Sequence, residues 1–121
     1  MNRQTIFERY GGFAKVSQMV TSFYDKMIDS SVTGPYFTDV DMKRLIDHQT
    51  KFFSAVMGGP ASFTTDHLER VHARLGITEE AFQEAVTLLG QTLQEFNLAP
   101  EDLNAVKNEV LRCKSYIVTR S

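Results

Sequence analysis

The chain has 121 residues, of which 42% are hydrophobic and 23% charged, and its 13 basic and 15 acidic residues give a formal net charge of −2. This length predicts a single domain over residues 1–121, and the charge balance excludes the basic surface of a nucleic-acid-binding protein. No apolar run approaches the roughly 20 residues of a membrane span. Cys113 is the single cysteine, and Glu8 and Arg9 interrupt any signal-like apolar core, so we expect a cytoplasmic protein.

Between clusters of glycine and proline, the apolar residues recur with the 3.6-residue period of α-helices. Residues 1–10 are expected to form a short helix and residues 13–28 a long one. The inner positions of this long helix are Val16, Val20, Phe23, Tyr24 and Met27. The next helix is expected over residues 41–57, with Asp41 as its N-cap. Its inner positions are Leu45, Gln49, Phe52, Phe53 and Val56.

The second half of the chain predicts two further long helices. Residues 61–74 are expected to be mostly loop, and a short helix there carries Leu68, Val71, His72 and Leu75. Thr78 is the expected N-cap of the third long helix, and Pro100 lies in the first turn of the fourth. Their inner positions are Phe82, Val86, Leu89, Leu93 and Phe96, then Leu103, Val106, Val110, Cys113 and Ile117. No segment alternates as strands do, so the predicted fold class is all-α.

Three polar residues, Tyr24, His48 and Gln49, fall on or beside the apolar faces of these helices. A buried polar group without a partner costs about 1–3 kcal/mol. The three side chains are therefore expected to converge on something polar inside an apolar pocket. His72 also faces inward, at helical spacing from Leu68 and Leu75. Imidazole is a common ligand of metals, including haem iron.

These residues also have a plainer interpretation. An inward histidine is more often a hydrogen-bonded core residue than a metal ligand, and the same applies to Tyr24 and Gln49 taken singly. The phenylalanines and Cys113 fit a core as well as a pocket, and His67, between acidic residues, is expected to be exposed. Spacing alone predicts an all-α domain with room for a ligand, and it leaves open a cofactor-free interaction module.

Four motifs follow one another along nearly the whole chain: FERYGGF, SFYDKM, PYFTDVDMKRLIDHQTKFFSAVMGGP and HLERVHARLGIT. In this order and spacing they resemble the truncated haemoglobins, the short two-on-two globins, and most closely their first group. The resemblance implies a truncated globin fold, a two-over-two helical sandwich around haem b.

The resemblance also implies roles for individual residues. His72 takes the place of the proximal iron ligand, Tyr24 that of the distal tyrosine that hydrogen-bonds oxygen, and Gln49 that of a distal glutamine in the same network. Leu45 stands where longer globins carry a distal histidine, and Phe53 resembles the residue that lines or gates an apolar tunnel. The other expected haem contacts are Phe37, Leu68, Leu75, Ile77, Phe82 and Val86.

Three further positions add to the family pattern or depart from it. Thr65 stands where the family often has a glycine before the proximal helix. His48 matches a position that in some relatives carries a histidine able to bind iron as a sixth ligand, and the alternative is that its side chain points to a haem propionate or to solvent. Some relatives tether haem through the last helix, so a thioether from Cys113 to a haem vinyl group is an alternative to simple core filling.

The function implied by the resemblance is reversible binding of oxygen and other diatomic gases, including nitric oxide and carbon monoxide, by a monomer. Conversion of nitric oxide to nitrate with oxygen, supported by an unidentified reductase, would make the protein an enzyme. The alternative is a bis-histidine haem protein, with His72 and His48 both on the iron, for electron transfer or reduction of small nitrogen oxides.

Overall fold

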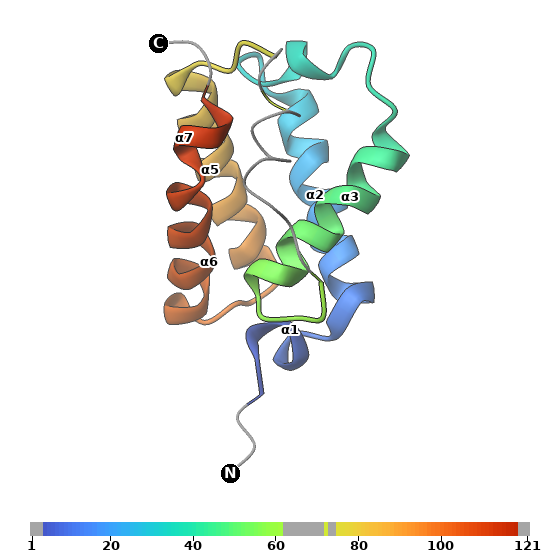
Figure 1. Ribbon diagram of the computed structural model, residues 1–121, viewed down its shortest axis with the longest axis vertical. Helices are drawn as coiled ribbons and strands as arrows, with labels where there is room; N and C mark the ends of the chain where they lie inside the picture. Colours follow the sequence, from blue (N-terminus) through green and yellow to red (C-terminus); the bar gives the residue numbers. More distant parts are fainter. Residues whose placement is uncertain (1–3, 62–71, 73–74, 119–121) are drawn as a thin grey trace.

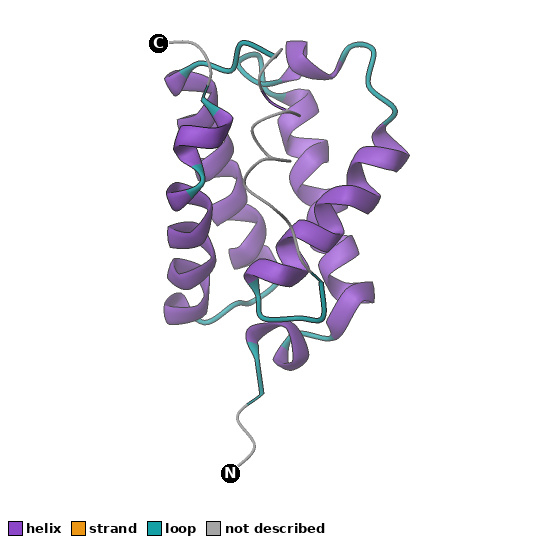
Figure 2. Ribbon diagram, in the orientation of Figure 1, coloured by secondary structure: helices purple, strands orange, loops and turns teal. Residues whose placement is uncertain are grey.

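Helices make up the regular structure of the described part of the chain. The computed structural model describes residues 4–61, 72 and 75–118, and the regular elements within these ranges are helical (Figure 2). In chain order they are α1 (Ile6–Arg9), α2 (Gly12–Asp29), the 3-10 helix η1 (Gly34–Phe37), α3 (Met42–Val56), α5 (Glu79–Glu95), α6 (Pro100–Arg112) and α7 (Lys114–Ile117). The predicted all-α class is confirmed. Among the described residues, no helix combines the length and apolarity needed to cross a membrane.

The long helices begin and end where capping chemistry predicts. The Asp41 carboxylate accepts a hydrogen bond from the Arg44 amide at 3.2 Å, and the Thr78 hydroxyl accepts one from the Ala81 amide at 3.1 Å. Each bond satisfies a backbone donor that the first helical turn leaves unpaired. Beyond the end of α5, Asn97 adopts a left-handed conformation with φ of 64°, which reverses the chain toward α6.

Two pairs of helices form a sandwich around one core (Figure 1). α2 packs against α3 in one pair and α5 packs against α6 in the other, while α2 also contacts α5. The side chains of Val16, Leu93 and Val106 are at most 1% exposed and form the centre of the core between the pairs. This arrangement confirms the two-over-two sandwich that the family resemblance implies.

The end of the chain differs from the continuous last helix that apolar spacing predicts. α6 ends at Arg112 and α7 begins at Lys114, with Cys113 between them. The Cys113 amide donates to the Val110 carbonyl at 3.0 Å, three residues back rather than four, and this tighter turn interrupts the helix. Periodicity missed the break because inner positions recur with the same spacing on both sides of it.

A hydrogen-bonded cluster joins the α1 region to the start of α6. The Arg9 guanidinium donates to both oxygens of the Asp102 carboxylate, at 2.7 and 2.8 Å, and the Tyr10 hydroxyl donates to Asp102 at 2.7 Å. The Tyr10 hydroxyl also accepts a bond from the Ala99 amide at 2.9 Å. The hydrogen bonds from Arg9 and then from Tyr10 hold the pKa of Asp102 below its ordinary value, so this largely buried carboxyl stays charged.

Candidate functional site

A cavity of about 310 Å³ lies between the helix pairs, within the size range of small-molecule pockets. Its walls come from α2, η1, α3, α5, the ends of α6 and α7, His72 and the turn that follows it. The residues that line it are Phe23, Tyr24, Met27, Thr33, Tyr36, Phe37, Val40, Leu45, Gln49, Phe52, Phe53, His72, Leu75, Ile77, Ala81, Phe82, Ala85, Val86, Leu89, Val110 and Ile117. The lining is mostly apolar and aromatic, so polar groups within it are conspicuous.

Tyr24 and Gln49 bring such polar groups to the cavity from α2 and α3. Tyr24 is only 8% exposed, and burial raises the pKa of its phenol, which keeps the hydroxyl protonated at neutral pH. Among the hydrogen bonds formed by the described residues, none involves the Tyr24 hydroxyl or the Gln49 amide. Both side chains therefore retain donors for a molecule inside the cavity.

Aromatic packing fixes the position of the Tyr24 ring. The ring contacts Phe23 and Phe37 edge to face, with centroids 5.0 and 5.6 Å apart. Phe23 in turn contacts Phe53 at 6.1 Å, and Phe53 contacts Phe52 at 5.1 Å. Edge-to-face contacts at these distances are favourable and restrict ring rotation, so the hydroxyl of Tyr24 is held in one place.

The predicted site residues come together at this cavity, with few exceptions. Leu75 is 44% exposed and therefore lies toward the rim, whereas Phe82 and Val86 are buried on α5. The predicted residues that line the cavity are Tyr24, Phe37, Leu45, Gln49, Phe53, His72, Leu75, Ile77, Phe82 and Val86. Leu68, Thr65 and His67 lie outside the described residues.

Of the two orientations expected for His48, toward the iron or toward solvent, the structure shows the second. His48 is exposed and does not line the cavity, whereas its neighbour Gln49 is half-buried and does. Successive residues of an α-helix point about 100° apart, so when Gln49 faces the cavity His48 turns away from it. The expectation that His48 lies on or beside the apolar face is therefore corrected, and this conformation offers no second histidine toward the cavity among the described residues.

Cys113 is buried but does not line the cavity, although Val110 and Ile117 on either side of it do. Burial raises the pKa of its thiol, which favours the unreactive protonated form. The side chain belongs to the hydrophobic core. Core filling, one of the two roles predicted for Cys113, agrees with this position.

Sequence reasoning missed two polar residues of the cavity wall. The Thr33 hydroxyl, which is almost fully buried, donates to the Met27 carbonyl at 2.6 Å and closes the corner between α2 and η1. The Tyr36 hydroxyl donates to the Gly76 carbonyl and accepts from the Thr78 amide, both at 3.4 Å. Neither residue stands out by helical spacing, because both lie in irregular or 3-10 structure.

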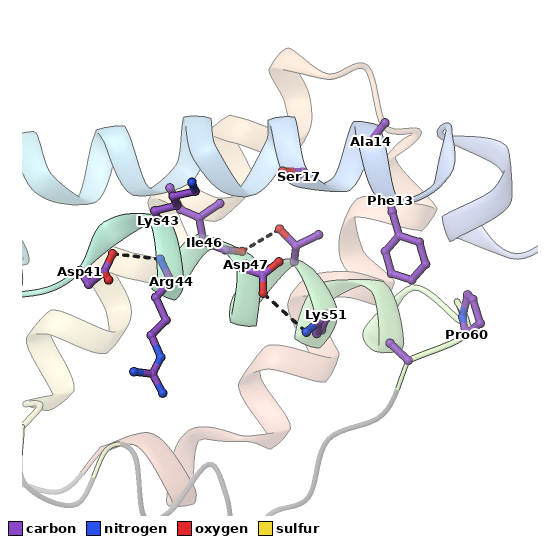
Figure 3. Close-up of a pocket in the computed structure, with 12 residues that line it drawn as sticks. Phe13, Ala14, Ser17, Asp41, Lys43, Arg44, Ile46, Asp47, Lys51 and Pro60 are labelled. Atoms are coloured by element: carbon purple, nitrogen blue, oxygen red, sulfur yellow. Dashed lines mark hydrogen bonds and ion pairs between the residues drawn. The ribbon is translucent and has the colours of Figure 1, made fainter.

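A second, larger hollow is an open groove of about 1110 Å³ between α2 and α3 (Figure 3). Charged side chains, including Lys43, Arg44 and an ion pair of Lys51 with Asp47 at 3.5 Å, make up much of its lining. No histidine, tyrosine or glutamine lines it. The cavity beside His72 is therefore the better candidate for a cofactor site.

The cavity residues fit a flat apolar cofactor that carries its own metal. Within the described parts of the chain, no group of three histidine, cysteine, aspartate or glutamate side chains could hold a metal ion. One imidazole, apolar walls and two polar donors do match the needs of haem, whose iron takes a single axial histidine and leaves a position for a small ligand.

Comparisons with known proteins agree with this interpretation. Residues 5–118 match the family described as bacterial-like globins. The chain is 30% identical over 105 residues to the group 1 truncated hemoglobin GlbN of Synechocystis sp., covering 84% of each chain. It is 27% identical over 115 residues to the GlbN protein of Mycolicibacterium paratuberculosis, covering 95% of this chain and 85% of the relative. The crystal structure of truncated hemoglobin from Tetrahymena pyriformis in its Fe(III) form shares the fold, with a TM-score of 0.83, 23% identity and coverage of 98% and 100%.

Proposed function

Because the chain belongs to the bacterial-like globin family and is a haem-binding globin of the group 1 truncated hemoglobin type, we propose that it reversibly binds oxygen and other diatomic gases in the cavity beside His72. Haem b, when bound, would supply an iron that takes one protein ligand and one small gas. The rest of the proposal concerns what the protein's own side chains contribute.

His72 is the proposed proximal ligand. It is the one histidine that lines the cavity among the described residues, and it precedes α5 by a short turn. Its neutral imidazole nitrogen would hold the haem iron. Phe37, Phe82 and Val86 would pack against the haem faces and edge and exclude water from them.

The Tyr24 hydroxyl is the observation that carries the oxygen-binding proposal. It is a protonated donor without a hydrogen-bond partner among the described residues, and its ring packs edge to face in the wall of an apolar cavity. Such a donor would hydrogen-bond a partly negative ligand such as oxygen, with a net contribution of about 0.5–1.5 kcal/mol. The Gln49 amide would add a second bond of the same kind, since Leu45 provides no donor at the neighbouring position.

Oxidation of nitric oxide to nitrate by oxygen is the proposed further activity. Both gases are small and nearly apolar, and the apolar lining of the cavity would admit them without the cost of binding an ion. No described side chain at the cavity is a strong acid or base. The protein's part would therefore be to bind and orient the two molecules, while a separate reductase supplies electrons for repeated turnover.

The first experiment tests the proximal ligand. His72→Ala should lose most of its haem after purification with excess haem, whereas His48→Ala, a change at an exposed histidine on α3, should keep full occupancy. The readout is the haem-to-protein ratio and the Soret absorption band. Full occupancy of His72→Ala with an unchanged Soret band would refute the role of His72.

The second experiment tests oxygen retention. Tyr24→Phe keeps the ring and removes the hydroxyl, so oxygen dissociation should become about five-fold faster if one bond near 1 kcal/mol is lost. Tyr10→Phe serves as the control, because that hydroxyl bonds to Asp102 and Ala99 and does not line the cavity. Stopped-flow measurement of an unchanged dissociation rate in Tyr24→Phe would remove this tyrosine from the mechanism.

A further inference from the structure

The Tyr36 side chain connects two parts of the cavity wall that are far apart in sequence. Its ring lines the cavity from η1, and its hydroxyl reaches the turn that joins His72 to α5. The hydroxyl donates to the Gly76 carbonyl and accepts from the Thr78 amide, at 3.4 Å in each case. We call residues 75–78 the proximal turn. One hydroxyl therefore connects η1 to two positions of this turn, Gly76 and Thr78.

The two segments that Tyr36 connects, η1 and the proximal turn, differ in how tightly their backbones are packed. In η1, the Gly34 amide donates to the Ser30 carbonyl at 2.7 Å, and a side chain at Gly34 would lie 2.6 Å from the Ile28 carbonyl oxygen. The proximal turn is open by comparison: Gly76 has φ of +62° and a Cβ there would meet nothing within 4 Å, and Leu75 is 44% exposed. η1 is thus the anchor and the proximal turn the part that is restrained.

We propose that Tyr36 is a positioning residue that clamps the proximal turn against the cofactor and so slows haem loss. The inference rests on the proposed haem site at His72. The proximal turn carries Leu75 and Ile77, which line the cavity, and the Leu75 amide donates to the His72 carbonyl at 3.1 Å. Opening of this turn would withdraw two apolar contacts from the haem and loosen the backbone that carries its ligand.

Tyr36→Phe tests the clamp, since it keeps the ring in the wall and removes only the hydroxyl. Loss of one net hydrogen bond should speed amide hydrogen exchange at Thr78 by about five-fold in the haem-free protein. Ferric haem should then transfer to excess apomyoglobin about five-fold faster than from wild type. Tyr10→Phe is the matched control: its hydroxyl also bridges two segments, but away from the cavity, so haem transfer should stay at the wild-type rate.

Each outcome decides the proposal. Faster Thr78 exchange together with faster haem transfer, in Tyr36→Phe alone, supports the clamp. Unchanged Thr78 exchange would refute the contact itself, and faster exchange with a wild-type transfer rate would reduce Tyr36 to a structural residue. If wild type binds no haem, the proposed function fails and this inference with it, whereas equal transfer rates from haem-loaded proteins overturn the clamp alone.

Discussion

Tyr24 and Tyr10 allow one chemical change, tyrosine to phenylalanine, to be made in opposite environments. The Tyr10 hydroxyl donates to Asp102 at 2.7 Å and accepts from the Ala99 amide at 2.9 Å. The Tyr24 hydroxyl forms no hydrogen bond with a described residue, although Tyr24 is only 8% exposed. We therefore expect the two variants to change the stability of the haem-free protein in opposite directions.

The magnitudes follow from these contacts. Tyr10→Phe removes one bond to a carboxylate and one to a backbone amide, and it should lower the free energy of unfolding by about 2 kcal/mol, or roughly 8 °C in the thermal midpoint. Tyr24→Phe removes a hydroxyl that is partly desolvated by burial and bonds to no described residue. It should raise the free energy of unfolding by about 1 kcal/mol, while the aromatic contacts with Phe23 and Phe37 remain.

Urea unfolding of the haem-free proteins, followed by circular dichroism, measures both effects. The slopes of the transitions should agree, so that the midpoints compare stability directly. If Tyr24→Phe loses as much stability as Tyr10→Phe, the Tyr24 hydroxyl is already bonded in the haem-free protein. The argument that it is reserved for a ligand would then be wrong.

Three further outcomes can be checked on the same proteins. Asp102→Asn should be less stable than wild type at neutral pH, because the lowered pKa of Asp102 means that the folded state favours the charged carboxyl. The difference should shrink as the pH falls below about 4, where wild type begins to lose the same stabilisation, and a gap in urea midpoints that is as large at pH 3 as at pH 7 would contradict this. Cys113 should react slowly with iodoacetamide at pH 8 until urea unfolds the chain, since burial raises the pKa of its thiol; rapid labelling would show that the thiol reaches solvent. Acid–acetone should extract all haem, and haem retained on the protein would show that the thiol is bonded to the cofactor. His48→Leu should leave the ferrous spectrum and the rate of carbon monoxide binding unchanged, as His48 is exposed; a low-spin wild-type spectrum that the variant lacks would instead mean that α3 moves to bring this histidine to the iron.

Local chemistry was predictable from the sequence. A cap needs one side chain and a backbone amide three residues later, and so Asp41 and Thr78 marked the starts of α3 and α5. Periodicity within one helix placed Tyr24 on the buried face of α2 in the same way. Such signals need no knowledge of how the helices pack.

The pair His48 and Gln49 shows where periodicity becomes ambiguous. His48 lies three residues after Leu45 and four before Phe52, while Gln49 lies four after and three before. Both positions satisfy the helical rule equally, because each is close to the midline between two inner residues. The packing of α3 against α2 decides which one faces the cavity, and in this structure it is Gln49.

Contacts between distant segments gave no local signal at all. Tyr36 reaches Gly76 across 40 residues, and Arg9 reaches Asp102 across 93. Each of these residue types is also common at exposed positions, so composition and spacing do not distinguish residues that form such contacts from ordinary surface residues. The tertiary fold brings these distant segments together, and so places Tyr36 in the cavity wall and Arg9 in the cluster at Asp102.

The fold separates a polar group that serves stability from one that is available for binding, and this separation is itself testable. Tyr10 follows α1 and bonds to Asp102 and Ala99, whereas Tyr24 lies in α2 and contacts Phe23 and Phe37. Stability effects of independent sites usually add within about 0.5 kcal/mol. The Tyr10→Phe/Tyr24→Phe double variant should therefore have a free energy of unfolding about 1 kcal/mol below that of wild type, which is the sum of the two single changes. It should release oxygen at the rate of Tyr24→Phe alone. A coupling free energy above about 1 kcal/mol in the urea midpoints, or an oxygen dissociation rate that depends on Tyr10, would show that the cluster at Asp102 and the cavity act as one unit.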